Sequence, residues 1–264
     1  MEGKLAVLQL NLNSIRARAT ELRYHLSRGS YDVLCLQETK LGPNNGNVKL
    51  IGYTCLRSDR PGVSKGGEGG LAIYIKEGVV HEDLTLNVKE LEGQGAVIHM
   101  SDGTKIAVIN IYSPPNREVV NGYQYLYDHI KYPRILICGD FNAHHALWGS
   151  KRTDRRGRVL YSFMEDNGLC VLNDGSPTCF RPGCEPSHID LTLASPAISS
   201  YCDWTIGNDD TFGSDHLAIT IILLDKSPYR DNTDGKKNLE NEQSKLGPLQ
   251  PTLPRVEGRE TGVR

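Results

Sequence analysis

The sequence of 264 residues contains no run of about 20 apolar residues, the length that a membrane-spanning helix needs. Residues 1–4 lead directly into a strand-like pattern, without the apolar region of a signal peptide. We therefore expect a soluble, intracellular protein with no signal peptide and no membrane partner.

The sequence also lacks the paired Cys and His spacing of a zinc domain. Its seven cysteines are an odd number, and Cys35 and Cys138 lie within apolar runs, where a free thiol behaves as a small apolar group. Cys179 and Cys184 are close enough in a loop-like stretch to pair or to bind a metal, but no second Cys/His pair accompanies them. The cysteines indicate a reducing compartment.

A strong net charge is absent as well, since the formal net charge is -2. Residues 1–225 hold 22 basic and 26 acidic residues, so the main part of the chain is mildly acidic. Acidic groups that converge on a divalent cation have their charge offset locally. The overall charge therefore neither supports nor excludes a phosphate-containing substrate.

Short β-branched segments bounded by Gly, Pro, Asn and Asp dominate the sequence and predict strands. The expected strands are residues 5–10, 32–36, 70–75, 96–100, 105–111, 134–138, 189–193 and 217–224. Most of them follow one another without an intervening helix, which favours mixed or antiparallel sheets over a doubly wound parallel sheet.

Helical spacing occurs at residues 15–26, closed by Gly29, at residues 159–168 and, more weakly, at residues 121–130. We expect an α/β (α+β) domain over residues 1–225, with two packed mixed β-sheets flanked by helices. Residues 226–264 are rich in Gly, Pro, Asn, Lys and Glu without apolar periodicity, which predicts a disordered tail or linker.

The stretch Gly139-Asp140-Phe141-Asn142 directly follows the apolar segment 134–138. Groups that face ligands in open α/β sheets lie at the carboxyl ends of strands. Asp140 and Asn142, two residues apart, point the same way on an extended backbone. Both residue types are also ordinary turn formers, so this motif gains weight only from similar motifs elsewhere.

Other strand ends carry side chains of the same kind. Each one alone is explained as well by a surface turn or by packing, but their repetition along the chain is not. The full set, all able to bind a hard cation, a phosphate or a proton, comprises Asn11, Asn13, Glu38, Tyr112, Asp140, Asn142, Asp190, Asp215 and His216.

In this order the motifs resemble those of the endonuclease/exonuclease/phosphatase superfamily. They are residues 10–13 (LNLN), 37–39 (QET), 111–114 (IYSP), 139–142 (GDFN), 187–190 (SHID) and 213–216 (GSDH). Within that superfamily, residues 139–149 and 187–191 look most like the apurinic-type endonuclease domain of non-LTR retrotransposons. That family nicks chromosomal DNA so that the exposed 3′-hydroxyl primes reverse transcription.

The resemblance implies a four-layered α/β sandwich that uses Mg²⁺, with Mn²⁺ as the alternative ion. Glu38 is then the metal ligand, because a hard cation prefers one or two carboxylates with waters and phosphate oxygens. Asp215 would add a second or water-mediated contact. Asn13 would serve either the outer shell of the metal or the turn into the first helix.

The remaining roles also follow from the resemblance. Asp140 would orient or deprotonate the attacking water, and Asn142 would bind a phosphate oxygen. Asp190 would fix the tautomer of His216, which acts either as a base or as a phosphate-holding group. Two further side chains, Asn11 and Tyr112, would donate hydrogen bonds to the phosphate or the leaving group. The products would carry 3′-hydroxyl and 5′-phosphate ends.

Double-stranded DNA is the expected partner, and a nuclear location follows from that substrate. A reverse transcriptase or element RNA in a parent polyprotein would be further partners. Residues 151–158 form a dense basic run, and residues 174–186 are expected to form a hairpin that enters a groove. The expected DNA-contacting residues are Arg16, Arg18, Lys151, Arg152, Arg155, Phe180 and Arg181.

Three alternatives remain open. An abasic-site repair endonuclease is the nearest, although residues 187–189 lack the tryptophan of those enzymes. Another phosphodiesterase or phosphatase of the superfamily would use the same site. A decayed domain that only binds nucleic acid is disfavoured, because the metal, water-activating and histidine positions are all retained.

Overall fold

The computed structural model describes residues 3–62, 66–86, 88, 90–128, 130–207 and 212–224, so the predicted tail at 226–264 lies outside the described residues. The described residues form two six-stranded sheets. Sheet A has the order β11 (Cys202–Ile206), β12 (Ile219–Leu224), β1 (Lys4–Asn11), β2 (Val33–Gln37), β4 (Leu71–Lys76) and β3 (Tyr53–Ser58). Sheet B has the order β5 (His81–Leu84), β6 (Glu92–His99), β7 (Lys105–Tyr112), β8 (Ile135–Asp140), β10 (Asp190–Ala194) and β9 (Cys170–Val171).

Each sheet has one parallel pair at its centre, and the other described pairings are antiparallel. In sheet A the parallel pair is β1 and β2, with Asn11 opposite Gln37 at the carboxyl end. In sheet B it is β7 and β8, with Tyr112 opposite Asp140. The two parallel pairs therefore end on the predicted site residues Asn11, Tyr112 and Asp140, and Glu38 directly follows β2.

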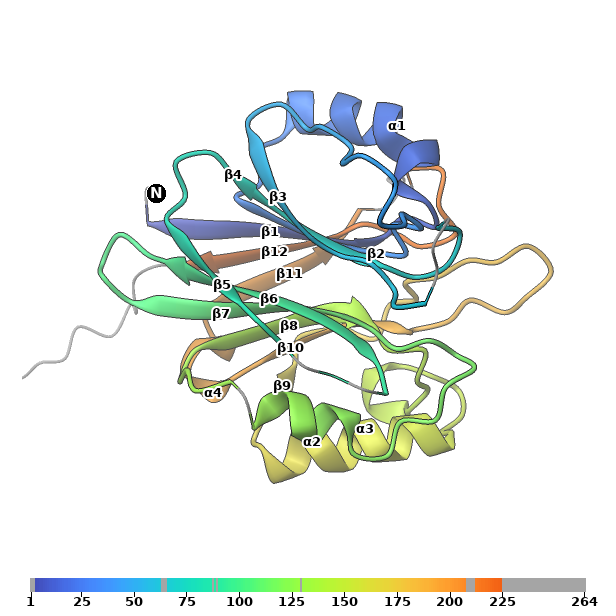
Figure 1. The fold of residues 1–264 in the computed structure, drawn as a ribbon. Helices are drawn as coiled ribbons and strands as arrows, with labels where there is room; N and C mark the ends of the chain where they lie inside the picture. The colour runs from blue at the N-terminus through green and yellow to red at the C-terminus, as the bar shows by residue number, and fades with distance from the viewer. Residues whose placement is uncertain are drawn as a thin grey trace, which may run out of the picture. The chain divides into compact units, whose positions relative to one another are not determined.

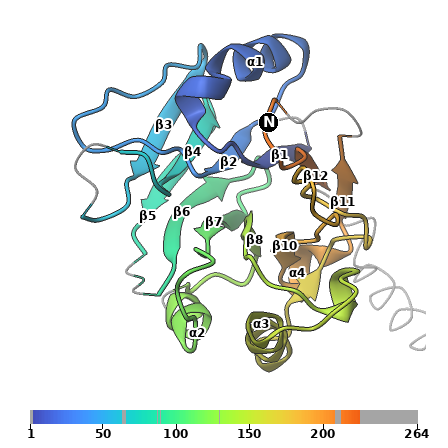
Figure 2. The same cartoon turned by 90° about the vertical axis from the view of Figure 1, so that its right-hand side faces the viewer.

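Helices cover the outer faces of both sheets and give four layers (Figures 1 and 2). Helix α1 (Ile15–Arg28) packs on sheet A, and α2 (Gly122–Tyr127) and α3 (Arg155–Asp166) pack on sheet B. A third apolar cluster fills the space between the sheets. The predicted four-layered sandwich of two mixed sheets is confirmed.

The sequence did not predict β3, β5, β9 and β11, and all four are edge strands of their sheets. None of their residues is fully buried. A strand with one free edge needs no continuous apolar run, so it lacks the signal that identified the central strands.

The predicted helices are present with shifted bounds. The backbone N–H of Gly29 donates to the carbonyl of His25 at the end of α1, as a C-cap does. Helix α3 begins at Arg155, earlier than predicted, because the Asp154 side chain accepts from Gly157 N–H and caps it. A short helix α4 (Pro196–Ser199) and a 3₁₀ turn η1 (Ala146–Trp148) complete the described elements. Among the described helices, none has the length and apolar character needed to span a membrane.

Candidate active site

Asn11 joins the two sheets at the end of the sandwich where the parallel strands finish. Its side-chain amide donates to Glu38 Oε1 at 3.0 Å and to Asp140 Oδ2 at 2.9 Å. Asn11 and Glu38 come from sheet A and the following turn, whereas Asp140 ends β8 in sheet B. One buried amide thus fixes the spacing of two carboxylates from different sheets.

Asp140 is fully buried and lies opposite Asp190 in the β8–β10 register. Burial, followed by the nearby charge of Asp190, raises the pKa of Asp140 to about 7. The charge of His216 and hydrogen bonds from Asn11 and the Asn142 N–H limit this rise. A carboxyl group with a pKa near neutrality is suited to exchange protons with water.

His216 and Asp190 form a buried pair beside Asp140. Nδ1 of His216 lies 2.9 Å from both carboxylate oxygens of Asp190. Burial lowers the pKa of His216, but Asp190 outweighs burial and the net pKa is raised well above its usual value. The Thr178 hydroxyl donates to Asp190 Oδ2 at 2.7 Å and accepts the Asp190 N–H at 3.1 Å, which holds the carboxylate in place.

A group of oxygen donors lies on the other side of Asn11. The Lys40 ammonium is 3.4 Å from Glu38 Oε2 and also donates to Asn13 Oδ1. The Asn13 amide is 3.5 Å from Asp215 Oδ1. A cationic group already sits among these oxygens, and carboxylate and amide oxygens are the donors that Mg²⁺ prefers. Glu38, Asn13 and Asp215 therefore suit a hard divalent cation.

The backbone of this region is strained. In the described part of the chain, four of the six non-glycine residues with positive φ belong to the site. They are Asn13 (48°), Glu38 (49°), Lys40 (54°) and Asn142 (46°). Left-handed backbone at Glu and Lys is uncommon, and such strain concentrates at functional sites.

Tyr112 is buried beside these acids. Burial and the charges of Glu38 and Asp140 raise its pKa, so it keeps its proton and acts as a donor. The Arg60 guanidinium lies 5.7 Å from the centre of the Tyr112 ring and pairs with Glu92 at 2.6 Å. The sequence pattern does not identify three of these neighbouring residues, because none of them ends an apolar strand. They are Arg60, Lys40 and Thr178.

A layer of buried amides beneath the site ties the sheets together. Gln37 of sheet A donates to Asn110 Oδ1 of sheet B at 2.7 Å, and Asn110 donates back to the carbonyls of Leu36 and Ala72. Gln9 donates to the Gly139 carbonyl at 3.1 Å and accepts from a hydroxyl of β10. These hydrogen bonds fix the alignment of the two sheets relative to each other next to Asp140.

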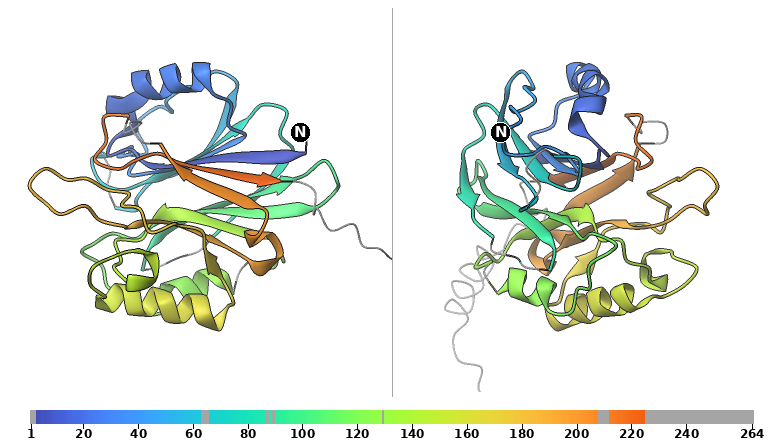
Figure 3. Two further views of the ribbon diagram at one scale, coloured as in Figure 1. Left: turned by 180° about the vertical axis from the view of Figure 1, so that it is seen from behind. Right: turned by 45° about the vertical axis from the view of Figure 1, so that its right-hand side comes forward.

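The hairpin predicted at residues 174–186 is closed by a bridge between Cys179 and Ser187, and it projects from the site end (Figure 3). Cys179 pairs with Ser187 through backbone hydrogen bonds in both directions. Phe180 is 45% exposed near the start of the hairpin. Arg181 Nε lies 3.0 Å from Asp215 Oδ2, so the hairpin is connected to the acidic site.

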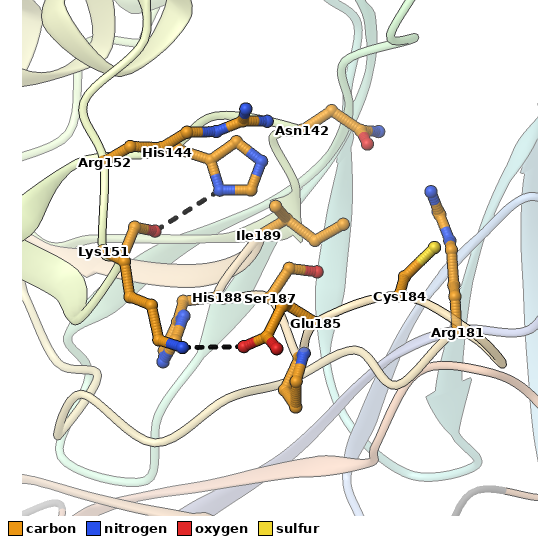
Figure 4. A pocket seen from close by; sticks show the side chains of 12 residues that line it. Asn142, His144, Lys151, Arg152, Arg181, Cys184, Glu185, Ser187, His188 and Ile189 are labelled. Carbon is orange, nitrogen blue, oxygen red and sulfur yellow. Dashed lines mark hydrogen bonds and ion pairs between the residues drawn. The ribbon is translucent and has the colours of Figure 1, made fainter.

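A pocket of about 490 Å³ lies between this hairpin and the loop after β8 (Figure 4). Asn142 and His144 line one side, Arg181 another, and Lys151 and Arg152 border it. Three of the predicted DNA-contacting residues, Lys151, Arg152 and Arg181, are thus brought together. The Lys151 ammonium is paired with a hairpin carboxylate at 2.7 Å.

The other predicted basic residues lie elsewhere. Arg155 is on α3 and pairs with Glu118. Arg16 and Arg18 are in the first turns of α1, with Arg18 against Gly213 in the loop before Asp215. Within the described residues, the structure therefore offers basic groups on both flanks of the acidic site.

Comparison with known proteins agrees with this architecture. The sequence model of the Endonuclease-reverse transcriptase family matches residues 106–220. A probable RNA-directed DNA polymerase from transposon X-element of Drosophila melanogaster is 28% identical over 232 residues, 83% of this chain and 24% of that protein. The matched segment, residues 106–220, thus resembles that family. The chain's relatives include RNA-directed DNA polymerases of transposons and mobile elements, and the predicted resemblance is confirmed.

Solved structures show the same fold. The endonuclease domain of TRAS1, a telomere-specific non-LTR retrotransposon, has a TM-score of 0.70 and 22% identity, covering 84% of this chain and 100% of that domain. The AP endonuclease LMAP from Leishmania major has a TM-score of 0.66 and 16% identity, covering 84% and 88%. The chain spans about a quarter of the length of the transposon relatives it matches.

Proposed function

We propose that this chain is a Mg²⁺-dependent DNA endonuclease that nicks double-stranded target DNA and leaves 3′-hydroxyl and 5′-phosphate ends. In the parent retrotransposon, such a nick would prime reverse transcription in the nucleus, with a reverse transcriptase or element RNA as partner. The observation that carries the proposal is the Asn11 bridge, which holds Glu38 on one side and Asp140 on the other.

Glu38 would hold the cation, with Asp215 and Asn13 completing the protein's share of its coordination. When bound, Mg²⁺ would supply positive charge to the phosphate and to the leaving oxygen. The oxygen-only donor set and the Lys40 ammonium beside Glu38 support this assignment. A hard cation is favoured there because no sulfur or imidazole donor belongs to that group.

Asp140 would orient the attacking water and accept its proton, which a pKa of about 7 permits. Asn142 would donate its amide to a phosphate oxygen beside that water. His216, held by Asp190, would stabilise the phosphate as a cation or exchange a proton with it. Tyr112 would donate to the leaving side of the phosphate. The expected donation from Asn11 to the phosphate or leaving group does not fit the structure, because its two amide hydrogens already go to Glu38 and Asp140.

The DNA would lie across the site between α1 and the hairpin. Arg16 and Arg18 would contact phosphates on one flank, and Lys151, Arg152 and Arg181 on the other, without reading sequence. Arg155 would extend the second flank along α3, and exposed Phe180 would contact the groove. Duplex binding is favoured over an abasic-site function because residues 187–189 provide no tryptophan to hold a baseless sugar.

The test is nicking of supercoiled plasmid by the purified 264-residue chain with and without Mg²⁺. We expect the wild type to convert supercoiled to open-circular DNA only with the metal, and Asp140→Ala and His216→Ala to abolish this conversion. End-labelling of the nick, with ligation by DNA ligase, checks the 3′-hydroxyl and 5′-phosphate ends. Equal nicking by both variants would refute the proposal.

A further inference from the structure

Cys179 and His216 form a contact that the proposed reaction does not use. The Cys179 Sγ lies 3.6 Å from Nε2 of His216, on the opposite side of the ring from Asp190. Together with a carboxylate oxygen of Asp215, these atoms lie within 4.8 Å of one another. Cys179 is fully buried at the start of the hairpin and is anchored there by its backbone pairing.

We propose that Cys179, His216 and Asp215 form a binding site for zinc, through which Zn²⁺ inhibits the enzyme. A thiolate, an imidazole and a carboxylate are the three side-chain donors that zinc takes in proteins. Mg²⁺ does not favour sulfur or nitrogen, so this set is distinct from the oxygen donors around Glu38. Only Asp215 belongs to both sets.

The spacing of the first two donors suits zinc. Zinc binds sulfur at about 2.3 Å and imidazole nitrogen at about 2.1 Å, which in a tetrahedral site separates the two donors by about 3.6 Å. The Sγ to Nε2 distance in the structure is also 3.6 Å. These two ligands would therefore need little movement to receive the ion.

The second observation is the orientation of His216. A histidine that binds zinc usually donates its other ring N–H to a carboxylate, which fixes the tautomer and makes the ligating nitrogen more basic. Here Asp190 accepts at Nδ1, and Thr178 in turn holds Asp190. Asp190 and His216 would thus form, with the ion, the carboxylate–histidine–zinc arrangement of zinc sites.

Arg181 pairs with one of the three proposed zinc ligands. Its guanidinium is paired with Asp215 at the exposed side of the cluster, whereas Cys179 and His216 are buried. A cation bound to Asp215 would compete with Arg181 for its negative charge. Removal of the guanidinium should therefore strengthen zinc binding, a result opposite to that expected if Arg181 supported the site.

Inhibition rests on the proposed function, and zinc binding does not. Bound zinc would occupy Nε2 of His216, the ring nitrogen that does not face Asp190 and that would meet the phosphate. It would also draw Asp215 away from the Mg²⁺ donors. Both effects would slow nicking without any contact to DNA.

Binding is tested on the full chain with Co²⁺ as a spectroscopic probe, in the presence of Mg²⁺ and without DNA. We expect one equivalent of Co²⁺ to give a thiolate-to-cobalt charge-transfer band that Zn²⁺ removes by competition. Cys179→Ala should lose the band, whereas Cys184→Ala, which removes an exposed cysteine of the same hairpin, should keep it. Absence of the band in the wild type, or its survival in Cys179→Ala, would overturn the site.

Two further variants separate ligands from neighbours. Asp190→Asn should weaken Zn²⁺ binding about 10–100-fold, the usual cost of losing a carboxylate behind a histidine ligand. Arg181→Ala should bind Zn²⁺ more tightly than the wild type. Unchanged affinity in both variants would contradict the assignment.

Inhibition is then measured by titrating Zn²⁺ into the plasmid-nicking reaction at fixed Mg²⁺, with each protein compared to its own zinc-free rate. Cys179→Ala should require more Zn²⁺ than the wild type for half inhibition. A cobalt band without any nicking would refute the nuclease and leave the metal site standing. Nicking that is insensitive to zinc, in a protein that shows the band, would refute the inhibition.

Discussion

Asp140 and Asp190 face each other across the antiparallel pair of β8 and β10, and both carboxyl groups are buried. Asp190 has a charged partner in His216, whereas the hydrogen bonds to Asp140 come from neutral groups, the Asn11 amide and the Asn142 N–H. This difference of environment separates the roles of two neighbouring acids, because only one of them has its negative charge directly compensated.

The pH dependence of stability should change when Asp140 is replaced. Its pKa is raised from 3.8 to about 7, so the folded state binds this proton more tightly than the unfolded state. The resulting stabilisation is complete below about pH 4 and is lost as the pH rises through about 7. Over this window the free energy of unfolding of the wild type should fall relative to that of Asp140→Asn by on the order of 4 kcal/mol.

Urea unfolding at several pH values, at fixed ionic strength and without divalent cations, measures this difference. Parallel pH profiles for the wild type and Asp140→Asn would show that the carboxyl group does not titrate as described.

Thr178→Val should weaken both the fold and the reaction. The hydroxyl donates to Asp190 Oδ2 and accepts the Asp190 N–H, and valine has the same shape without either bond. Leaving these buried groups unpaired should cost about 1–3 kcal/mol in the free energy of unfolding. Nicking should slow because His216 loses a fixed partner, and Thr178→Ser, which keeps the hydroxyl, should recover most of the rate.

The Gln37–Asn110 bond between the sheets should show energetic coupling. Gln37→Leu or Asn110→Leu alone leaves the other buried amide without its partner, which costs about 1–3 kcal/mol. The double variant should be more stable than the sum of the two losses predicts, by about 0.5–1.5 kcal/mol. Strict additivity in a double-mutant cycle of urea unfolding would mean that the bond contributes nothing.

Gly139→Ala should be strongly destabilising. A Cβ at this position would lie 2.2 Å from the carbonyl oxygen of Ile111 on the neighbouring strand, so β7 and β8 would have to separate. We expect a loss of at least about 2 kcal/mol in the free energy of unfolding, together with reduced nicking. Gly46→Ala, where the added carbon meets no atom within 4 Å, should change stability by less than about 0.5 kcal/mol. Similar thermal melting of the two variants would refute the close approach.

Arg181→Ala should reduce the salt dependence of DNA binding. Loss of one phosphate contact lowers the slope of log affinity against log salt concentration by about 1. Arg134→Ala is the matched control, because Arg134 precedes β8 at the end opposite to Asp140. Fluorescence anisotropy with a labelled duplex in the absence of Mg²⁺ gives both slopes. An equal slope for Arg181→Ala and the wild type would place Arg181 outside the DNA contact.

The central strands and the residues at their ends could be predicted because a buried strand leaves a continuous apolar run, and a polar residue after it stands out. Asp140 after residues 135–138 is the clearest case. Edge strands such as β3 and β11 leave no such run. Thr178 and Cys179 lie between loop residues, and their proximity to Asp190 and His216 arises only from tertiary folding. The sequence does not indicate the position of Lys40 either, because that position depends on a left-handed backbone turn.

The Asn11 bridge also determines what a chain shortened at its N-terminus would lose. The Endonuclease-reverse transcriptase family model matches residues 106–220. This segment contains Asp140, Asp190 and His216, but it contains neither Asn11 nor Glu38. A chain shortened by its first hundred residues would thus keep the whole segment that the family model matches. It would have lost β1, with which β12 pairs, and the Glu38 carboxylate that Asn11 holds near Asp140. Under the proposed function, the capacity to cut DNA is therefore better judged from the first forty residues than from the segment that the family model matches.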